Sequence, residues 1–277
     1  MQLLTLTSDI GLQDFMPAAI KGQIMQAAPN FNIIDVTHLL SPFNYPQAAY
    51  VCRNAIKNFP TGTYHLILIN LFDEKCDHLL FIEHNGHYIG CADNGLITMI
   101  LEELPQKITA LTLEKNQPRN ILYCTGVFAK AFSKLESGTP FAEIGYHDIS
   151  IKVKNPLKPM LGNNWIEGQI IFIDNFENVI VNISKEEFEE QRKGRRFSIV
   201  FKRDESIEKI SETYADVPEG EKVALFNAAG YLEIAINKGN AAGLFGLQGF
   251  SERQQKVLQV QFSNNHIFYQ TVKVHFQ

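Results

Sequence analysis

The chain has 277 residues, of which 45% are hydrophobic and 20% charged, as in an ordinary globular protein. Its 25 basic and 30 acidic residues give a net charge of −5, which argues against a general nucleic-acid-binding protein. The four cysteines form no Cys-x-x-Cys pair, which argues against zinc-ribbon and thioredoxin-like sites. No apolar run approaches the roughly 20 residues that span a bilayer, and no signal peptide is recognisable at the N-terminus. We therefore expect a cytoplasmic protein without a metal, a membrane or a nucleic-acid partner.

The first half of the chain alternates between strand and helix patterns. Short apolar runs predict strands at residues 3–7, 32–36, 65–71, 79–83 and 88–91. The last two form a predicted hairpin, because the turn signal Asn85-Gly86 separates them. Helices are predicted at residues 15–28 and 46–57, and a third begins at Asp93-Asn94-Gly95. This rhythm is typical of an α/β layer with a largely parallel sheet.

The second half changes character after a polar stretch rich in Pro, Gly and Asn. We place an N-terminal domain at residues 1–155, a linker at 156–164 and a smaller C-terminal domain at 165–277. Ser184-Lys185-Glu186-Glu187 fits a capping box, so a helix is expected from there to about Gly194. Strands are predicted at residues 169–173, 179–183, 196–202, 223–226, 231–236, 256–262 and 266–276. Such a module is antiparallel, either a barrel or a sandwich.

Several polar residues lie where ligands bind in α/β proteins. Asp9 follows the first strand, where its carboxylate could accept hydrogen bonds from ribose hydroxyls or simply cap the next helix. Asp9 with Asp14 loosely resembles the paired aspartates of calcium-dependent nucleoside hydrolases, but the spacing does not reproduce that acidic cluster. His38, after the second strand, suits a structural hydrogen bond or catalysis. Phe43 could stack on a heterocycle or pack.

In the second half, the turn Asp174-Asn175-Phe176-Glu177-Asn178 holds a carboxylate, an aromatic ring and an amide within five residues. That set suits an amine, a flat base and its ring edge, although an ordinary turn also uses Asp and Asn. The small residues of 227–230 and 239–242 would let a ligand approach backbone amides.

Taken in order, these segments resemble the S-adenosyl-L-methionine (SAM) hydroxide adenosyltransferase family, whose halogenating relatives are the fluorinases and chlorinases. The matching segments are Thr7-Ser8-Asp9-Ile10-Gly11, Asp35-Val36-Thr37-His38, Asp93-Asn94-Gly95-Leu96, Ile173-Asp174-Asn175-Phe176-Glu177-Asn178-Val179-Ile180 and Gly230-Tyr231-Leu232-Glu233-Ile234-Ala235. The resemblance covers nearly the whole chain. It implies an N-terminal α/β domain, a C-terminal β-barrel domain, and a homotrimer with SAM held between domains of neighbouring subunits.

The resemblance also implies roles for individual residues. Asp9 would bind the ribose hydroxyls and Phe43 would stack near the adenosyl group. Asp174 would hold the methionine ammonium, while Phe176 and Asn178 would meet the adenine. The remaining ligand-loop positions are Ala228, Tyr231 and Glu233. The family reaction is a displacement at ribose C5′ with methionine leaving as a neutral thioether, so SAM is a substrate and no cofactor is implied.

The chain departs from the family pattern at the residues that handle water. By an ungapped alignment, the family's Asp, Arg and His fall on Asn70, Asp77 and Tyr123, and a loop Ser falls on Ala228. Thr125, Tyr123 or His38 would then have to activate the nucleophile. The extra loop of the halogenating branch is not found, which argues against a halide enzyme. Two hypotheses remain: a SAM-cleaving enzyme that uses water, and an inactive trimer that binds SAM or adenosine as a sensor or scaffold.

Overall fold

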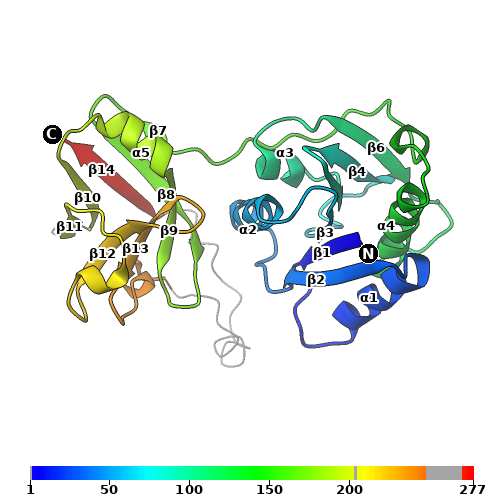
Figure 1. Cartoon of the computed structure of the whole chain (residues 1–277), viewed down its shortest axis with the longest axis horizontal. Coiled ribbons are helices and arrows are strands. Elements are labelled where there is room, and N and C mark those ends of the chain that lie inside the picture. The colour runs from blue at the N-terminus through cyan, green and yellow to red at the C-terminus, as the bar shows by residue number, and fades with distance from the viewer. Residues whose placement is uncertain (1, 203–204, 248–269) are drawn as a thin grey trace. The chain divides into compact units, whose positions relative to one another are not determined.

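The structure is a computed structural model that describes residues 2–202, 205–247 and 270–277 (Figure 1). The predicted strand at 256–262, its following turn and the start of the predicted strand at 266–276 lie outside these residues. The chain divides between Pro156 and Leu157 into two compact units, and each is described by itself. Among the described residues, no helix has the length and apolarity needed to cross a membrane.

The first unit is built on a six-stranded sheet in the order β2-β1-β3-β5-β4-β6. Its strands are β1 (Gln2–Ser8), β2 (Phe31–Thr37), β3 (Tyr64–Leu68), β4 (His78–His84), β5 (His87–Cys91) and β6 (Lys107–Thr112). β1, β2, β3 and β5 run parallel, whereas β4 pairs antiparallel with both of its neighbours. The carboxyl ends of the parallel strands therefore share one edge. Because β2 and β3 flank β1 on opposite sides, the topological switch point lies at the end of β1.

Helices cover both faces of this sheet. α1 (Met16–Ala27) and α4 (Ile121–Glu136) pack together on one face, and α2 (Tyr45–Lys57) and α3 (Leu96–Leu101) on the other. A 3₁₀ turn, η1 (Phe141–Glu143), follows α4. Within β3, Leu66 and Leu68 face the first layer and Ile67 faces the second, which is the arrangement its continuous apolar run predicts. The chain leaves the sheet at Leu68, earlier than the predicted end at residue 71.

The second unit is antiparallel throughout, in the strand order β11-β10-β14-β8-β9-β13-β12, with β7 paired to β8. The strands are β7 (Met160–Leu161), β8 (Trp165–Ile173), β9 (Val179–Ser184), β10 (Phe197–Lys202), β11 (Glu205–Ile207), β12 (Lys222–Phe226), β13 (Tyr231–Ile236) and β14 (Thr271–Phe276). An isolated bridge between Ile210 and Ala224 nearly closes the sheet into a barrel, as the family resemblance implies. β7 lies within the stretch expected as a linker.

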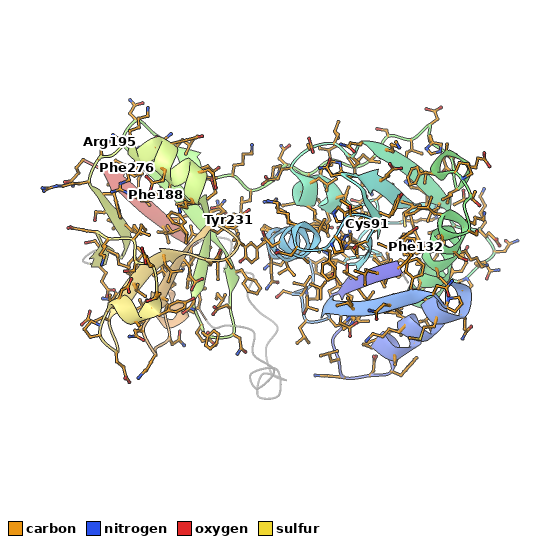
Figure 2. All side chains as sticks on the ribbon, viewed as in Figure 1. Cys91, Phe132, Phe188, Arg195, Tyr231 and Phe276 are labelled. Carbon is orange, nitrogen blue, oxygen red and sulfur yellow. The ribbon has the colours of Figure 1, made fainter. Side chains whose placement is uncertain are left out.

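One helix and two 3₁₀ turns complete the second unit: α5 (Lys185–Arg192), η2 (Tyr214–Asp216) and η3 (Ala242–Phe245). α5 begins with the predicted capping box, in which Ser184 and Glu187 bond to each other's backbone N–H groups. Figure 2 shows how α5 closes the core: the ring of Phe188 lies 5.7 Å from that of Phe276, and Arg195 covers the Phe276 ring at 5.2 Å. The rest of the buried core is mainly Ile, Val, Leu and Ala.

Candidate functional site

Asp9 and Asn70 meet at the switch point of the first sheet. Asp9 directly follows β1, Asn70 lies two residues after β3, and the Asn70 backbone N–H donates a 2.9 Å hydrogen bond to Asp9 Oδ2. Burial raises the pKa of the Asp9 carboxyl, while the hydrogen bond from Asn70 opposes that shift. The structure therefore fixes a partly exposed carboxylate where open α/β sheets bind ligands.

Asn70 organises the loop around Asp9. Its backbone is in the left-handed region, with φ 45°, which Asn tolerates better than most residues. Its Oδ1 accepts a 2.9 Å hydrogen bond from the Phe43 N–H, and its carbonyl accepts one from Asn94 Nδ2 at 3.2 Å. Asn94 Nδ2 also donates to the Ile69 carbonyl. Two predicted site residues, Asp9 and Phe43, are thus both bonded to Asn70.

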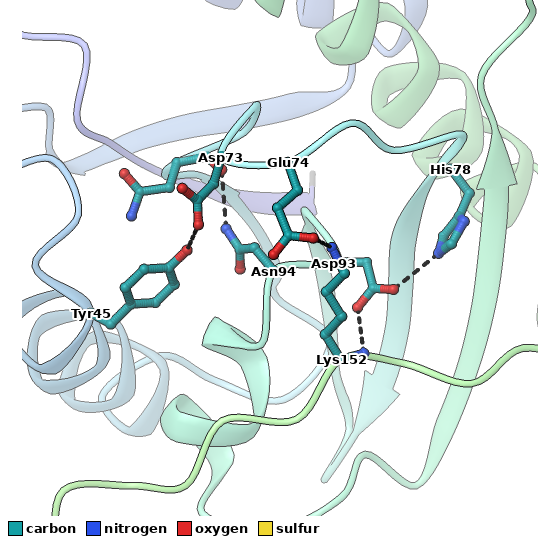
Figure 3. Close-up of polar contacts among 8 residues, drawn as sticks. Tyr45, Asp73, Glu74, His78, Asp93, Asn94 and Lys152 are labelled. Atoms are coloured by element: carbon teal, nitrogen blue, oxygen red, sulfur yellow. Dashed lines mark hydrogen bonds and ion pairs between the residues drawn. The ribbon is translucent and has the colours of Figure 1, made fainter.

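Aromatic side chains line this loop. Phe43 is exposed and is itself in a left-handed conformation, with φ 62°. Tyr45 begins α2, and its hydroxyl donates a 2.7 Å hydrogen bond to Asp73 Oδ2 (Figure 3). Burial and the Asp73 carboxylate raise the pKa of Tyr45, so its hydroxyl stays protonated and remains a donor. The Lys154 ammonium lies 3.5 Å from the centre of the Tyr45 ring. The site edge therefore carries one exposed ring and one tethered ring.

A carboxylate–histidine pair, in which the carboxylate is buried and the histidine partly exposed, lies at the same edge. Asp93 follows β5 and His78 opens β4, and the antiparallel β4–β5 pairing brings these two ends together. Asp93 Oδ2 lies 3.2 Å from His78 Nε2, and Asp93 Oδ1 accepts a 2.8 Å hydrogen bond from the Lys152 N–H (Figure 3). The Lys152 ammonium pairs with Glu74. Sequence analysis overlooked His78, because only the β4–β5 register shows that it meets Asp93.

The other predicted water-handling positions lie in different surroundings. The Asp77 side chain is exposed, and the nearest cation recorded for it is Arg119, whose Nη2 lies 4.0 Å from Asp77 Oδ1. The Tyr123 hydroxyl accepts a 2.8 Å hydrogen bond from the Glu114 N–H. Among the described residues, neither side chain has a recorded hydrogen bond to Asn70.

The Thr125 and His38 side chains are both buried and hydrogen-bonded. The buried Thr125 hydroxyl donates a 2.8 Å hydrogen bond to the Ile121 carbonyl one turn earlier in α4. The His38 ring is buried, with Nδ1 2.7 Å from Ser8 Oγ and Nε2 3.3 Å from Asp35 Oδ1. His38 thus connects the segment after β2 with the end of β1, and Thr125 bonds only within its own helix.

In the second unit, Asp174 organises the turn between β8 and β9. Its Oδ1 accepts hydrogen bonds from the N–H groups of Phe176 (2.9 Å) and Asn178 (2.8 Å), and its Oδ2 accepts one from Asn178 Nδ2 (3.0 Å). The Asn178 side chain is buried, whereas Phe176 is 76% exposed. The turn therefore presents a ring to the surface above an amide and a carboxylate.

Glu233 joins this cluster from β13. It pairs with Ile180, two residues after the turn, and is only 3% exposed. The Tyr214 hydroxyl of η2 donates a 2.6 Å hydrogen bond to its Oε1. Burial and the nearby Asp174 carboxylate raise the pKa of Glu233, while Tyr214 and Asn178 oppose the shift. Sequence analysis missed Tyr214, whose segment carries no strand or motif signal.

The structure separates the last two predicted ligand residues from this cluster. Ala228 is exposed in the turn between β12 and β13, and Tyr231 pairs with Ser184 at the far end of β9 from Asn178. The Asn227 side chain shapes that turn by accepting hydrogen bonds from the N–H groups of Ala229 and Tyr231. Among the described residues, no group of three or more His, Cys, Asp or Glu side chains could hold a metal ion.

Comparison with known proteins connects both units to one family. The model of the SAM hydroxide adenosyltransferase N-terminal domain matches residues 4–145, and that of its C-terminal domain matches residues 168–254. A (R)-S-adenosyl-L-methionine hydrolase of Thermus thermophilus is 28% identical over 257 residues, covering 87% of this chain and 94% of the relative. A fluorinase of Nocardia brasiliensis is 22% identical over 290 residues, covering 92% and 97%. A crystal structure of an uncharacterized conserved protein from Thermotoga maritima has the same fold, with a TM-score of 0.79, 24% identity and coverage of 99% and 100%.

Proposed function

Because this chain belongs to the SAM hydroxide adenosyltransferase family, we propose that it binds SAM and transfers the adenosyl group to water, giving adenosine and methionine. Relatives of this chain are named as SAM hydrolase and fluorinase, and these names support a reaction that processes SAM. The observation that carries the proposal is the Asp9 carboxylate, held by the Asn70 N–H at the switch point of the sheet. We assign it to the two ribose hydroxyls.

The proposed reaction depends more on the position of the attacking water than on polarisation of the C5′–S bond. Water attacks C5′ in line with the C5′–S bond, the bond electrons go to sulfur, and methionine leaves as a neutral thioether. Because the sulfonium is already a good leaving group, most of the rate enhancement comes from alignment of water and C5′. Asp9 supports this alignment by fixing the ribose, and the exposed ring of Phe43 by stacking near the adenosyl group.

The second unit offers the groups for the two ends of SAM. In this proposal the Asp174 carboxylate takes the methionine ammonium, while the Asn178 amide and the exposed Phe176 ring take the adenine. The family resemblance adds a homotrimer. No cofactor or metal is invoked, because SAM itself supplies the leaving group.

Asn70 favours a second candidate function. An amide cannot accept the proton of an attacking water at neutral pH, so a chain with Asn70 could bind SAM or adenosine as a sensor without turning it over. One experiment separates the two functions. Purified protein is titrated with SAM in a calorimeter and then incubated with SAM, and adenosine and methionine are followed by chromatography.

We expect binding together with release of both products. Binding without product would favour the sensor, and absence of binding would overturn both functions. Parallel incubations with fluoride and with chloride test the halide reaction, since a 5′-halogenated adenosine would replace adenosine as the product.

A further inference from the structure

We propose that His78 accepts the proton of the attacking water and that Asp93 holds its ring in the required tautomer. This inference rests on the proposed function, because it names the base for the same reaction. His78 and Asp93 are 15 positions apart in the sequence, and the β4–β5 pairing brings them together.

The geometry of the pair is that of an oriented base. Asp93 is buried and cannot swing freely, because its Oδ1 also accepts the Lys152 N–H at 2.8 Å. With Asp93 Oδ2 accepting from His78 Nε2 at 3.2 Å, the proton of the neutral ring sits on Nε2 and the lone pair on Nδ1. Among the described residues, Nδ1 has no recorded hydrogen bond, and the His78 side chain is 22% exposed. Water can therefore reach the basic nitrogen.

The pair is linked to the loop after β3, whose Asn70 N–H bonds Asp9. Asp93 and Asn94 are consecutive, so their Cα atoms are about 3.8 Å apart. The Asp93 side chain orients His78 (Figure 3). The Asn94 side chain donates to the carbonyls of Ile69 and Asn70. One dipeptide thus positions both the candidate base and the loop whose N–H holds the ribose-directed carboxylate.

The alternative bases are less accessible or chemically unsuited. The His38 ring is buried, with Nδ1 bonded to Ser8 and Nε2 enclosed without a hydrogen-bond partner among the described residues. The buried Thr125 hydroxyl is bonded to Ile121, and the Asn70 amide is not a base at neutral pH. Tyr123 is half-buried, and its hydroxyl oxygen already accepts the Glu114 N–H. His78, in contrast, combines an acceptor nitrogen, an orienting carboxylate and partial exposure.

Charged groups from several elements surround the pair. Glu74, Cys76 and Asp77 come from the loop before β4, Arg119 from the segment before α4, and Lys152 from the segment that leads to the second unit. Burial raises the pKa of the Cys76 thiol, Arg119 and Lys152 oppose that shift, and Asp77 and Asp93 add to it. A pH profile must therefore be read on variants as well as on the wild-type protein.

The proposed step is balanced. As the water oxygen bonds to C5′ and the C5′–S electrons pass to sulfur, one water proton moves to His78 Nδ1. The imidazolium then releases that proton to solvent, so SAM and water give adenosine, methionine and one proton. Asp93 takes no proton in this step and acts as a positioning residue.

The test compares His78→Gln, His78→Ala and Asp93→Asn with the wild-type protein. Adenosine release is measured against SAM concentration and pH, SAM binding is measured by calorimetry, and folding is checked by circular dichroism. We expect His78→Gln to lower kcat by about 10²–10⁴-fold with little change in SAM affinity, as for loss of a general base. The pH dependence of the rate should differ between this variant and the wild-type protein. Added imidazole should partly restore the rate of His78→Ala, which a purely structural role would not allow.

His275→Gln is the matched control, because it makes the same replacement at a half-buried histidine of β14. Asp93→Asn should lower kcat less than His78→Gln does. If the wild-type protein turns over SAM and folded His78→Gln is equally fast, His78 is not the base and the proposed function stands. If the wild-type protein binds SAM but releases no adenosine, both proposals are wrong. Failure of imidazole to rescue folded His78→Ala would also overturn the inference.

Discussion

The Tyr214 hydroxyl donates a 2.6 Å hydrogen bond to Glu233, a carboxylate buried in β13 and reached from 19 positions away along the chain. Tyr214→Phe would leave that oxygen without its donor, and a buried acceptor that loses its partner costs roughly 1–3 kcal/mol. We expect the free energy of unfolding, measured with urea at pH 7, to fall by about that amount. Tyr146→Phe, at an exposed tyrosine, is the control. Equal losses in the two variants would contradict this assignment.

The pH dependence of stability should reveal the raised pKa of Glu233. Because burial and Asp174 raise that pKa in the folded chain, the folded state binds the proton more tightly than the unfolded state. Stability is therefore lost as pH rises above the ordinary value of 4.5 and through the folded pKa. Glu233→Gln removes this loss and keeps an acceptor for Tyr214. We expect its melting temperature to exceed that of the wild-type protein at pH 8, and the gap to narrow at pH 4.5. A gap independent of pH would rule this out.

Two histidines buried near the amino ends of β3 and β5 should make the first unit sensitive to acid. Burial and the neighbouring His87 lower the pKa of His65 to about 3, and burial also lowers that of His87. The unfolded chain protonates these rings near pH 6.5. The stability that these neutral, buried rings contribute is therefore fully present above about pH 6.5 and is lost as pH falls toward 3. For each ring, the free energy of unfolding should fall by up to about 1.4 kcal/mol per pH unit.

Calorimetric melting from pH 7.5 to pH 5 tests this, with His65→Gln as the variant. In the wild-type protein the His65 ring nitrogens lie 2.7 Å from Thr5 Oγ1 and 3.1 Å from His87 Nδ1. The variant loses these contacts and should therefore be less stable at pH 7.5. It should nevertheless lose less stability on acidification than the wild-type protein. The same slope in both proteins would show that His65 is not the acid-sensitive group.

Asp9→Ala should weaken adenosyl binding. Loss of a charged acceptor costs roughly 1.5–3 kcal/mol, or about 10- to 150-fold in affinity. Calorimetric titration with SAM and with adenosine measures the effect, and Asp148→Ala, at an exposed aspartate of the same unit, is the control. Unchanged affinity in Asp9→Ala would show that the ribose binds elsewhere.

The homotrimer of the family resemblance is testable by mass. We expect sedimentation equilibrium of the wild-type protein to give three times the chain mass of 31.4 kDa. Because ligand residues are assigned to both units, dilution that dissociates the trimer should also weaken SAM binding. A 31.4 kDa species that binds SAM tightly would contradict the trimer.

Local signals predicted much of the fold. The apolar run of β3, the Asn85-Gly86 turn and the capping box of Ser184 and Glu187 each depend on neighbouring residues, and each lies where it was expected. The predicted end of β3 at residue 71 was too late, because the turn at Asn70 is set by hydrogen bonds from Asn94 and to Asp9, residues distant in sequence. No expectation covered α4, whose segment 123–130 contains Gly126 and the poor helix former Thr125 and is held by packing on α1.

From the sequence, candidate site residues could be named only where a single residue stands in a recognisable turn after a strand. Asp9, Phe43 and Asp174 could be singled out because each lies in a turn after a recognisable strand. The β4–β5 register brings His78 to Asp93, and the segment before β12 folds back to bring Tyr214 to Glu233. Hydrophobic periodicity tells which face a residue occupies, but not which residue of another segment lies opposite it.

The left-handed backbone at Asn70 limits the routes by which this position can change over evolutionary time. A φ of 45° is tolerated at low cost by Gly, Asn and Asp, while β-branched and bulky residues are strained there. Asp and Asn can therefore both adopt this backbone conformation, while Asp would place a second carboxylate beside Asp9. The backbone at this turn thus accepts either an amide or an acid, and the choice between them sets the charge beside Asp9.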